Sequence, residues 1–278
     1  MTLSKTPAAV LRDKIYKMER ERTGLFISDD EFSVYVYKKL KSKGMKVYPI
    51  SFTPCSFVKP RIFQLGDIGD ILGYLKKEGI KKLVFVGKVP AEAILGKVHP
   101  SSDIFFKGEE PLCGENILKN LADFLKKEDI DVMSLTDVLY DELAEEKLYT
   151  DIPLQISEKR DIETGVRFIR NIMKYRAGQS VVVKRGMIVA VEGIEGTDEM
   201  IRRAGRYCSD FVVVKMAGRY KDERFDMPVI GPHTIEVLSE AGGSAIAVES
   251  GRTIILNSSK IVSLCNKNRI TLIGIKGE

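Results

Sequence analysis

The sequence contains few of the residues on which several common kinds of site depend. It has two histidines, His99 and His233, which nearly excludes His-rich metal sites and catalytic triads. Its four cysteines lie far apart and form no C-x-x-C pair, so zinc is not expected and the pattern is typical of a reduced cytosolic protein. No apolar run reaches the ~20 residues that span a bilayer, and the beginning of the chain lacks the apolar segment of a secretory signal.

The size and composition are those of a soluble globular protein. A chain of 278 residues with 44% hydrophobic and 30% charged residues can bury a real core and favours two domains over one. The net charge is +5, and residues 151–278 carry 20 basic and 16 acidic residues of the totals of 44 and 39. Because the basic surplus is modest and lies in the second half, an anionic ligand is expected there and nucleic acid is not.

The first half alternates predicted strands with predicted helices. Apolar strands are expected at 24–27, 45–52 and 82–86, with helices at 31–43 and 68–78 between them. This alternation predicts an α/β fold with a parallel, Rossmann-like sheet, in which ligands bind at the carboxyl ends of the strands. At the end of the first strand the chain reads S-D-D-E over 28–31, which predicts a helix N-cap, with a cation site as the alternative.

The second half predicts another α/β domain. We expect an N-terminal Rossmann-like domain over 1–146, a linker over 147–158 where periodicity is lost, and a C-terminal catalytic α/β domain over 159–278. Within these boundaries a helix is expected at 137–146, a tight turn at 184–186 between strands at 180–184 and 187–191, and a hairpin turn at 249–252.

Two polar stretches stand out in the C-terminal half. The first, E-G-I-E-G-T-D-E-M-I-R-R at 192–203, follows a short apolar strand and begins a helix that Thr197 or Asp198 could cap. Gly196 lets the backbone come close to a ligand, and the N–H groups at a helix start form an anion site. A capped turn with solvated charges is the alternative reading of this stretch alone.

The second stretch runs from Lys215 to Glu236, after an apolar strand at 211–214. It holds several cations, then Asp226 before Met227-Pro228, then a Gly-Pro turn that enters a new helix. Cations around an isolated acid suit a phosphate ester with a divalent metal.

Both stretches resemble the UDP-2,3-diacylglucosamine pyrophosphatase family of lipid A biosynthesis. The resemblance rests on V-E-G-I-E-G-T-D-E-M-I-R-R at 191–203 and R-F-D-M-P-V-I-G-P-H-T-I at 224–235, and it extends to 178–192 and 241–256. It implies a two-domain Mg²⁺-dependent hydrolase that splits the pyrophosphate to give lipid X (2,3-diacylglucosamine 1-phosphate) and UMP. Independently, an anionic pyrophosphate requires a site that neutralises charge and orients a water, and Mg²⁺ prefers oxygen ligands.

The resemblance implies roles for individual residues. Asp226 matches the acid of the family's R-x-D-x-P motif and is expected to be the catalytic metal ligand, with Glu195 and Asp198 as further ligands or water-orienting bases. The residues expected to bind substrate are Thr197, Arg202, Lys215, Arg224, His233 and Thr234. For some of these an alternative remains: Arg202 pairs with Glu199 on the helix surface, Thr197 caps its helix, and His233 is a helix-entry residue without a catalytic role.

The expected partner is an acylated UDP-sugar or its product. Such a substrate predicts an apolar groove beside Asp226 and the 195–198 loop. It also predicts peripheral contact of a cytoplasmic protein with the inner membrane, while a homodimer stays open. Two alternative functions also stay open because the loops at 28–31, 114–116 and 218–221 depart from the family pattern: a related Mg²⁺ hydrolase of another nucleotide-sugar, and a lipid- or nucleotide-binding protein that has lost activity.

Overall fold

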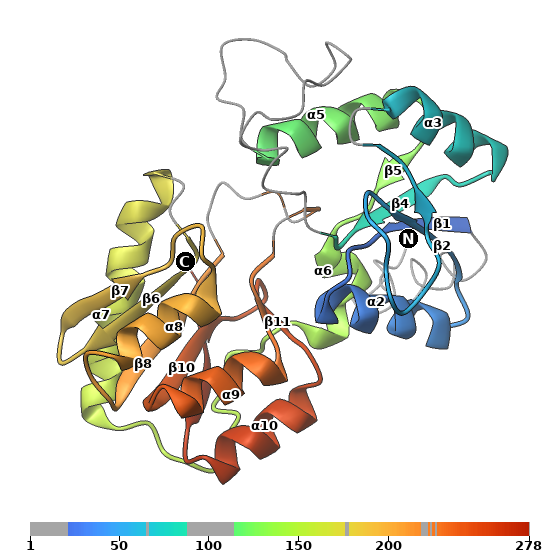
Figure 1. The fold of residues 1–278 in the computed structure, drawn as a ribbon. Helices are drawn as coiled ribbons and strands as arrows, with labels where there is room; N and C mark the ends of the chain where they lie inside the picture. Colours follow the sequence, from blue (N-terminus) through green and yellow to red (C-terminus); the bar gives the residue numbers. More distant parts are fainter. Residues whose placement is uncertain are drawn as a thin grey trace, which may run out of the picture. The chain divides into compact units, whose positions relative to one another are not determined.

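The computed structural model describes residues 22–64, 67–87, 114–175, 178–217, 222, 224–225 and 227–277. The described chain forms two compact units (Figure 1). The first unit holds the described residues up to Val138 together with Asp222, Arg224 and Phe225, and the second holds the others from Leu139 onward.

The first unit contains a five-stranded parallel sheet of Rossmann-like order. The strands run β3-β2-β1-β4-β5, and Leu25 at the centre pairs with Pro49 on one side and Val84 on the other. Their bounds are β1 Arg22–Phe26, β2 Lys46–Ser51, β3 Arg61–Ile62, β4 Lys82–Phe85 and β5 Asp131–Val132. The predicted fold class is therefore confirmed for this half of the chain.

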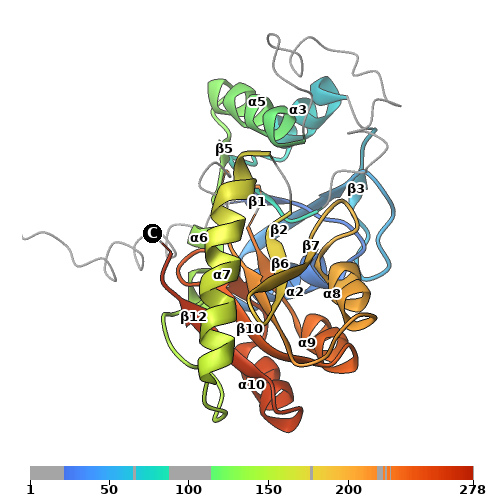
Figure 2. The ribbon, with the colours of Figure 1, turned by 90° about the vertical axis from the view of Figure 1, so that its left-hand side faces the viewer.

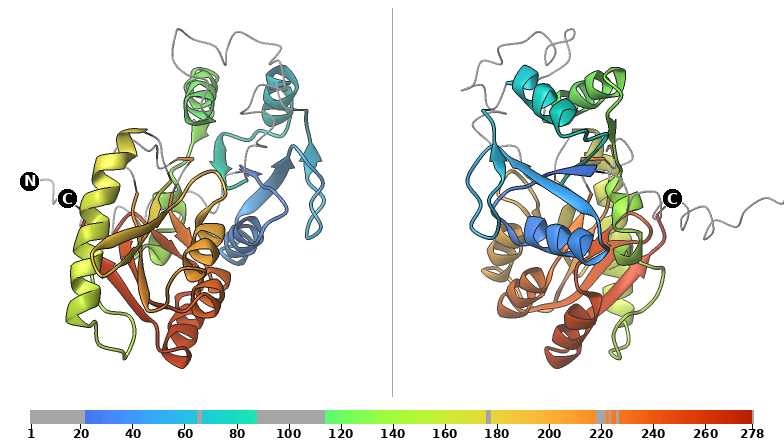
Figure 3. Two further views of the ribbon diagram at one scale, coloured as in Figure 1. Left: turned by 60° about the vertical axis from the view of Figure 1, so that its left-hand side comes forward. Right: turned by 90° about the vertical axis from the view of Figure 1, so that its right-hand side faces the viewer.

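Helices cover both faces of this sheet. Helices α3 and α5 lie on one face and α2 lies on the other (Figures 1 and 3). The α3–α5 face encloses a core made of apolar side chains from strands and helices, among them Phe26, Ile50, Leu83, Phe85, Ile71, Leu75, Leu121 and Leu125. The helix bounds are α2 Glu31–Ser42, α3 Ile68–Lys77, α5 Gly114–Lys127 and α6 Leu135–Val138.

The prediction of a helix over 137–146 is wrong. Helix α6 ends at Val138, and a short 3-10 turn, η1 (Tyr140–Glu142), follows it. Leu143 then forms an antiparallel bridge with Ile254. Backbone pairing with a distant segment replaces the local helix there, which sequence periodicity does not register.

The second unit contains a mixed five-stranded sheet of order β12-β10-β8-β6-β7. The strands β8, β10 and β12 are parallel, whereas β6 runs antiparallel to both β8 and β7. The predicted tight turn between β6 and β7 is confirmed, with Arg185 and Gly186 at positive φ. The bounds are β6 Ser180–Lys184, β7 Met187–Val191, β8 Phe211–Lys215, β10 Gly243–Glu249 and β12 Thr271–Ile275.

Helix α7 (Ile156–Ile172) covers one face of this sheet, and α8 (Thr197–Gly205), α9 (Pro232–Glu240) and α10 (Ser258–Lys267) cover the other (Figures 1 and 2). Alternate strand residues form two cores, as the period of two in a strand requires. The α7 core takes Val181, Val183, Val212 and Val214, and the opposite core takes Val182, Val213, Ile246 and Val248.

The prediction of a hairpin turn at 249–252 is also wrong. Strand β11 (Ile254–Ile255) does not pair with β10 but lies parallel to β9 (Val229–Ile230). Glu249 is buried at the end of β10, where its Oε2 accepts a hydrogen bond from Ala217 N at 2.8 Å. The buried carboxylate holds the chain end against the sheet, and the following residues turn away from it.

Residues of the expected linker over 147–158 are hydrogen-bonded within the second unit. Tyr149 N donates to Leu272 O, Gly274 N donates to Lys147 O, and Asp151 N donates to the side chain of Asn266. Helix α7 begins at Ile156, inside the expected linker, with a capping box formed by Gln155 and Glu158.

Close packing of α7 on β8 predicts a specific cost for Gly165→Ala. A Cβ at this position would lie 2.6 Å from Val214 Cγ2, so α7 or the strand must shift. We expect Gly165→Ala to destabilise the second unit by ~1–3 kcal/mol in urea unfolding. The matched control is Gly73→Ala in α3, where a Cβ meets no atom within 4 Å and helix propensity favours alanine by ~1 kcal/mol. Equal stability of the two variants would contradict the packing.

Candidate functional site

The loop between β7 and α8 ends in a left-handed glycine. Gly196 is the N-cap of α8 with φ of 85°, so the expectation that Thr197 or Asp198 caps this helix is wrong. Because glycine accepts this conformation without strain, the chain turns directly from the loop into the helix. The hydroxyl of Thr197 takes part in other bonds, and the first N–H groups of α8 remain at the helix start, where anions bind.

A buried cation lies behind this helix start. Lys215, at the end of β8, is 5% exposed. Its Nζ donates to Thr197 Oγ1 at 2.6 Å and to Ser180 Oγ at 3.3 Å. Thr197 Oγ1 donates in turn to Glu192 Oε1 at 2.9 Å. The result is a continuous chain from ammonium through hydroxyl to carboxylate, which offsets the cost of burying the charge of Lys215.

Glu195 is committed to holding the loop. Arg203 Nη2 donates to Glu195 Oε1 at 2.6 Å and to Val191 O at 2.9 Å. Hydrogen bonds from its own backbone N–H and from Arg203 lower the pKa of Glu195 below the ordinary value for a glutamic acid. A carboxylate with a lowered pKa is a weak proton acceptor at neutral pH, so its geometry suits loop positioning better than base catalysis.

The starts of α8 and α9 face each other through Asp198 and His233. Asp198 Oδ2 lies 3.8 Å from His233 Nε2, and His233 Nδ1 lies 3.7 Å from Glu236 of the same helix. Helix α9 begins at Pro232, so His233 and Thr234 occupy its first turn as expected. The structure thus brings together, in one unit, Thr197, Asp198, Lys215, His233 and Thr234. Two helix N-termini with a buried cation behind one of them form a setting that favours a negatively charged ligand.

The other expected site residues lie elsewhere. Arg202 pairs with Glu199 at 2.6 Å on the surface of α8, which is the alternative that the sequence left open. Arg224 belongs to the first unit, where its guanidinium binds Asp222. Asp226, the leading candidate, lies outside the described residues.

The described part of the chain contains no group of three or more His, Cys, Asp or Glu side chains able to hold a metal ion. In the 28–31 loop, Asp30 accepts from Ser33 N as the N-cap of α2, which confirms the predicted cap. Asp29 accepts from the backbone and hydroxyl of Ser56, and these bonds lower its pKa. Both acids thus have structural partners.

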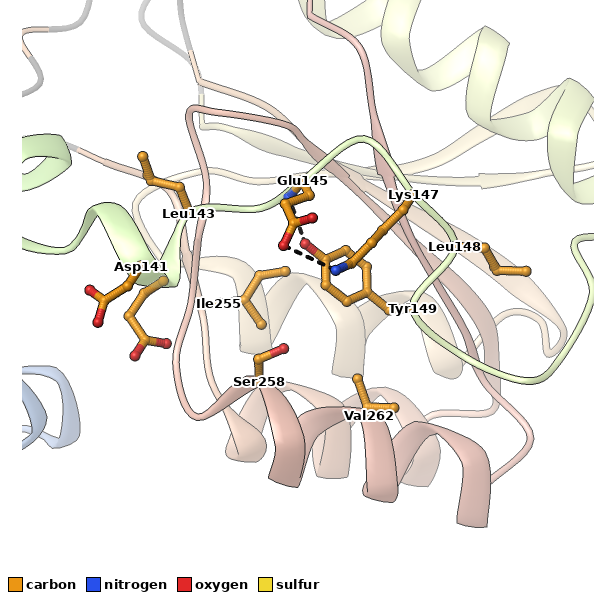
Figure 4. A pocket seen from close by; sticks show the side chains of 10 residues that line it. Asp141, Leu143, Glu145, Lys147, Leu148, Tyr149, Ile255, Ser258 and Val262 are labelled. Carbon is orange, nitrogen blue, oxygen red and sulfur yellow. Dashed lines mark hydrogen bonds and ion pairs between the residues drawn. The ribbon is translucent and has the colours of Figure 1, made fainter. Parts of the chain in front are cut away.

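The second unit has a pocket of about 460 Å³ between the 141–149 segment and α10 (Figure 4). None of its lining residues comes from the 195–198 loop. In Figure 4, Lys147 Nζ donates to Glu145 Oε1, and the backbone N–H of Glu145 donates to Tyr149 Oη. The pocket also contains Asp141 and Glu142, so it is distinct from the apolar groove expected beside the loop.

The sequence did not single out Ser180 as a partner of Lys215 or Glu192 as a partner of Thr197. Both lie within quoted motifs, and Ser180 occupies the register position opposite Lys215 in the antiparallel β6–β8 pair. Both residues could therefore be seen in the sequence, but the antiparallel direction of β6 and β8, which brings Ser180 to Lys215, could not. Antiparallel pairing of β6 with β8 brings a hydroxyl to the buried ammonium.

Loss of the Thr197 hydroxyl tests this chain of bonds. Thr197→Val keeps the shape of the side chain but removes one buried partner from Lys215 and one from Glu192. We expect a loss of ~1–3 kcal/mol in the free energy of unfolding of the second unit. Thr197→Ser keeps the hydroxyl and is the control, with most of the stability retained. Valine and serine variants of equal stability in urea unfolding would show that the chain does not stabilise the fold.

Fold and geometry together define a two-unit α/β protein whose second unit brings the starts of α8 and α9 together in front of a buried lysine. Comparison with known proteins gives the family. The models of the LpxI N-terminal domain and the LpxI C-terminal domain match residues 30–142 and 145–273. The chain belongs to the LpxI family, which confirms the resemblance. It is similar to the UDP-2,3-diacylglucosamine pyrophosphatase LpxI of Caulobacter vibrioides, with 25% identity over 229 residues that cover 76% of this chain and 80% of the relative.

Proposed function

We propose that the protein hydrolyses the pyrophosphate bond of UDP-2,3-diacylglucosamine to give lipid X and UMP. The observation that carries the proposal is the start of α8 in a chain of the LpxI family. There, a left-handed Gly196 and the buried Lys215–Thr197 pair lie beside the first turn of α9. Hydrogen-bond donors and a cation fixed in advance are what an anionic diester requires, because the charge that develops on phosphate oxygens meets them without reorganisation.

The phosphate contacts are assigned from this geometry. We assign them to the N–H groups at the start of α8 and to the charge of Lys215, with His233 and Thr234 contributing from α9. Arg202 joins them at small cost, because its exposed pair with Glu199 is worth only ~0–1 kcal/mol and can be exchanged for a phosphate oxygen.

Asp198 and Asp226 carry the acid roles in this proposal. The side chain of Asp198 is one-third exposed and lies 3.8 Å from a histidine, so its carboxylate can orient a water. Glu195 keeps the loop in place through Arg203. Asp226 follows the family motif and is assigned to the metal and the reacting phosphate.

The oxygen donors of this proposal, Asp198 and the family-motif acid Asp226, suit Mg²⁺. Carboxylate, phosphate and water oxygens are hard ligands, and Mg²⁺ usually takes one or two carboxylates with the remainder from substrate and water. A cluster of three acids is therefore not required. When bound, Mg²⁺ would neutralise charge on the pyrophosphate and polarise the phosphorus that is attacked.

No described helix combines the length and apolar character needed to cross a membrane. The substrate itself supplies the reason for a membrane encounter, because its two acyl chains partition into the bilayer. We propose peripheral contact with the cytoplasmic face of the inner membrane, aided by the basic surplus of residues 151–278.

Asp226→Ala tests the assignment of the acid. We expect turnover to fall ~100-fold or more, because water alone does not replace the charge that positions a metal-bound phosphate. EDTA should abolish activity and Mg²⁺ should restore it. Asp210→Asn is the control: Asp210 is an exposed acid just before β8, at the opposite end of that strand from Lys215. Full activity of Asp226→Ala, or of the wild type in EDTA, would contradict the assignment of Asp226 to the metal.

The acyl chains separate the proposed function from its nearest alternative, a hydrolase of another nucleotide-sugar, which the S-D-D-E loop at 28–31 keeps open. Burial of acyl chain contributes ~0.8 kcal/mol per CH₂, so even partial enclosure dominates affinity. We expect kcat/KM for the diacylated UDP-sugar to exceed that for its unacylated analogue by ~100-fold or more, since this requires burial of only a few CH₂ groups. Equal values, measured as UMP release, would favour the alternative.

A further inference from the structure

The turn that leads into α8 carries an exposed isoleucine. Residues 193–196 form this turn, which we call the β7–α8 turn, and a hydrogen bond from Gly196 N to Gly193 O at 3.3 Å closes it. Ile194 occupies the first of its two central positions. The residue is 88% exposed, which is more than the 78% of Tyr207 just beyond the other end of α8.

The conformation of the β7–α8 turn is fixed by its neighbours. Arg203 Nη2 donates to Glu195 Oε1 at 2.6 Å and to Val191 O at 2.9 Å, so one guanidinium holds both the turn and the end of β7. Gly193 leaves room for this carboxylate, since a Cβ at that position would lie 2.5 Å from Glu195 Oε2. The exposure of Ile194 is therefore imposed by a turn that is held in place on both sides.

The isoleucine contributes little to the fold at this position. Turns favour Gly, Pro, Asn, Asp and Ser, because these residues supply the required backbone angles or a local hydrogen bond. The exposed side chain of Ile194 also forgoes the favourable free energy of burial. One exposed apolar side chain is ordinary on a protein surface, but a residue that breaks a local preference without stabilising the fold indicates a functional position.

Ile194 lies next to the helix start that suits an anion. It precedes Thr197 by three residues, and the hydroxyl of Thr197 accepts a hydrogen bond from Lys215 Nζ at 2.6 Å. Consecutive Cα atoms are 3.80 Å apart, so the Cα atoms of Ile194 and Thr197 are separated by at most ~11 Å. An apolar side chain and a setting for an anion are thus neighbours within one unit. A ligand that matches both has an anionic group close to an apolar chain.

We propose that Ile194 contacts an acyl chain of the substrate and contributes to the selection of acylated over unacylated UDP-sugars. The proposal rests on the proposed function, in which phosphate oxygens bind at the start of α8. In 2,3-diacylglucosamine 1-phosphate the phosphate is on carbon 1 of the sugar and the first acyl group is on carbon 2. An acyl chain therefore begins one sugar carbon away from the phosphate, and its length covers the distance from the helix start to Ile194.

The substrate's chain suits Ile194 better than the bilayer does. Segments that lie in a membrane surface present several apolar side chains together with Lys and Arg on the polar side. The β7–α8 turn presents one apolar side chain between two glycines and the carboxylate of Glu195. A single aliphatic group of this kind is enough to contact one chain, but it adds little to binding of a lipid surface.

The test compares Ile194→Ser with Tyr207→Ser in the full-length protein. Tyr207 is the matched control because it is also a large exposed side chain, but it follows the C-terminal end of α8. Both residues are exposed, so both variants should fold, and thermal midpoints check this. We measure kcat and KM as UMP release from two UDP-sugars, one unacylated and one with two short acyl chains that stays dissolved. The dissolved substrate removes the bilayer from the comparison.

The expected readout is the ratio of kcat/KM for the acylated substrate to kcat/KM for the unacylated one. Ile194→Ser should lower this ratio ~10-fold, mainly by raising KM for the acylated substrate, because an apolar contact of a few methylene groups has an effect of this size. Tyr207→Ser should keep the ratio within about twofold of wild type. Ile194→Leu, which restores an aliphatic side chain, should recover most of the ratio.

Three outcomes overturn the proposal. A wild-type ratio in Ile194→Ser shows that the side chain does not contact the acyl chain. An equal loss for both substrates assigns Ile194 to the conformation of the turn. An unchanged ratio, combined with loss of co-sedimentation with vesicles of phosphatidylethanolamine and phosphatidylglycerol, assigns Ile194 to the membrane surface.

Failure of the proposed function gives a different result. In that case the wild-type protein itself releases no UMP from either substrate, or hydrolyses both equally well. The role of Ile194 then fails with it. A wild type that prefers the acylated substrate, together with an Ile194→Ser variant that shows the same preference, contradicts the role of Ile194 alone and leaves the proposed function standing.

Discussion

The buried ammonium of Lys215 is the constraint on which the second unit depends. A cation that is 5% exposed is tolerated only with polar partners around it, because the cost of leaving a charge in an apolar interior is several kcal/mol. Lys215 donates to the hydroxyls of Ser180 in β6 and Thr197 in α8, and Thr197 donates in turn to the carboxylate of Glu192 after β7. The antiparallel direction of β6 and the left-handed turn at Gly196 both serve this arrangement, since each places one partner.

Some of the charged side chains around Lys215 hold the fold together, and others are left to bind a ligand. Arg203 is bound to Glu195 and to a backbone carbonyl, which fixes the loop. Arg224 is bound to Asp222 in the other unit. The helix starts of α8 and α9 face each other in front of the buried Lys215, which is the setting that suits an anion. A charged residue in a motif can thus act on the ligand directly or by fixing the groups that do.

Much of the fold could be predicted because its elements have strong local patterns. The Rossmann-like alternation, the cap at Asp30, the β6–β7 turn and the helix beginning near Thr197 all follow from local signals such as hydrophobic period, capping residues and glycine. The failures concern long-range pairing. A bridge between Leu143 and Ile254 replaced a helix, and pairing of β11 with β9 replaced a hairpin. The contacts of Lys215 were missed for the same reason, since strand direction is not encoded locally.

The ring of Phe225 packs against the core of the first unit, yet it is synthesised well after the rest of that unit has left the ribosome. At ~5–20 residues per second, roughly 4–17 s separate the synthesis of Val138 from that of Phe225. Throughout that time the contact between the rings of Phe85 and Phe225 has not yet formed. Along the chain, the return to the first unit at Asp222, Arg224 and Phe225 lies between β8 and β10 of the second unit, so each unit is interrupted by a piece of the other.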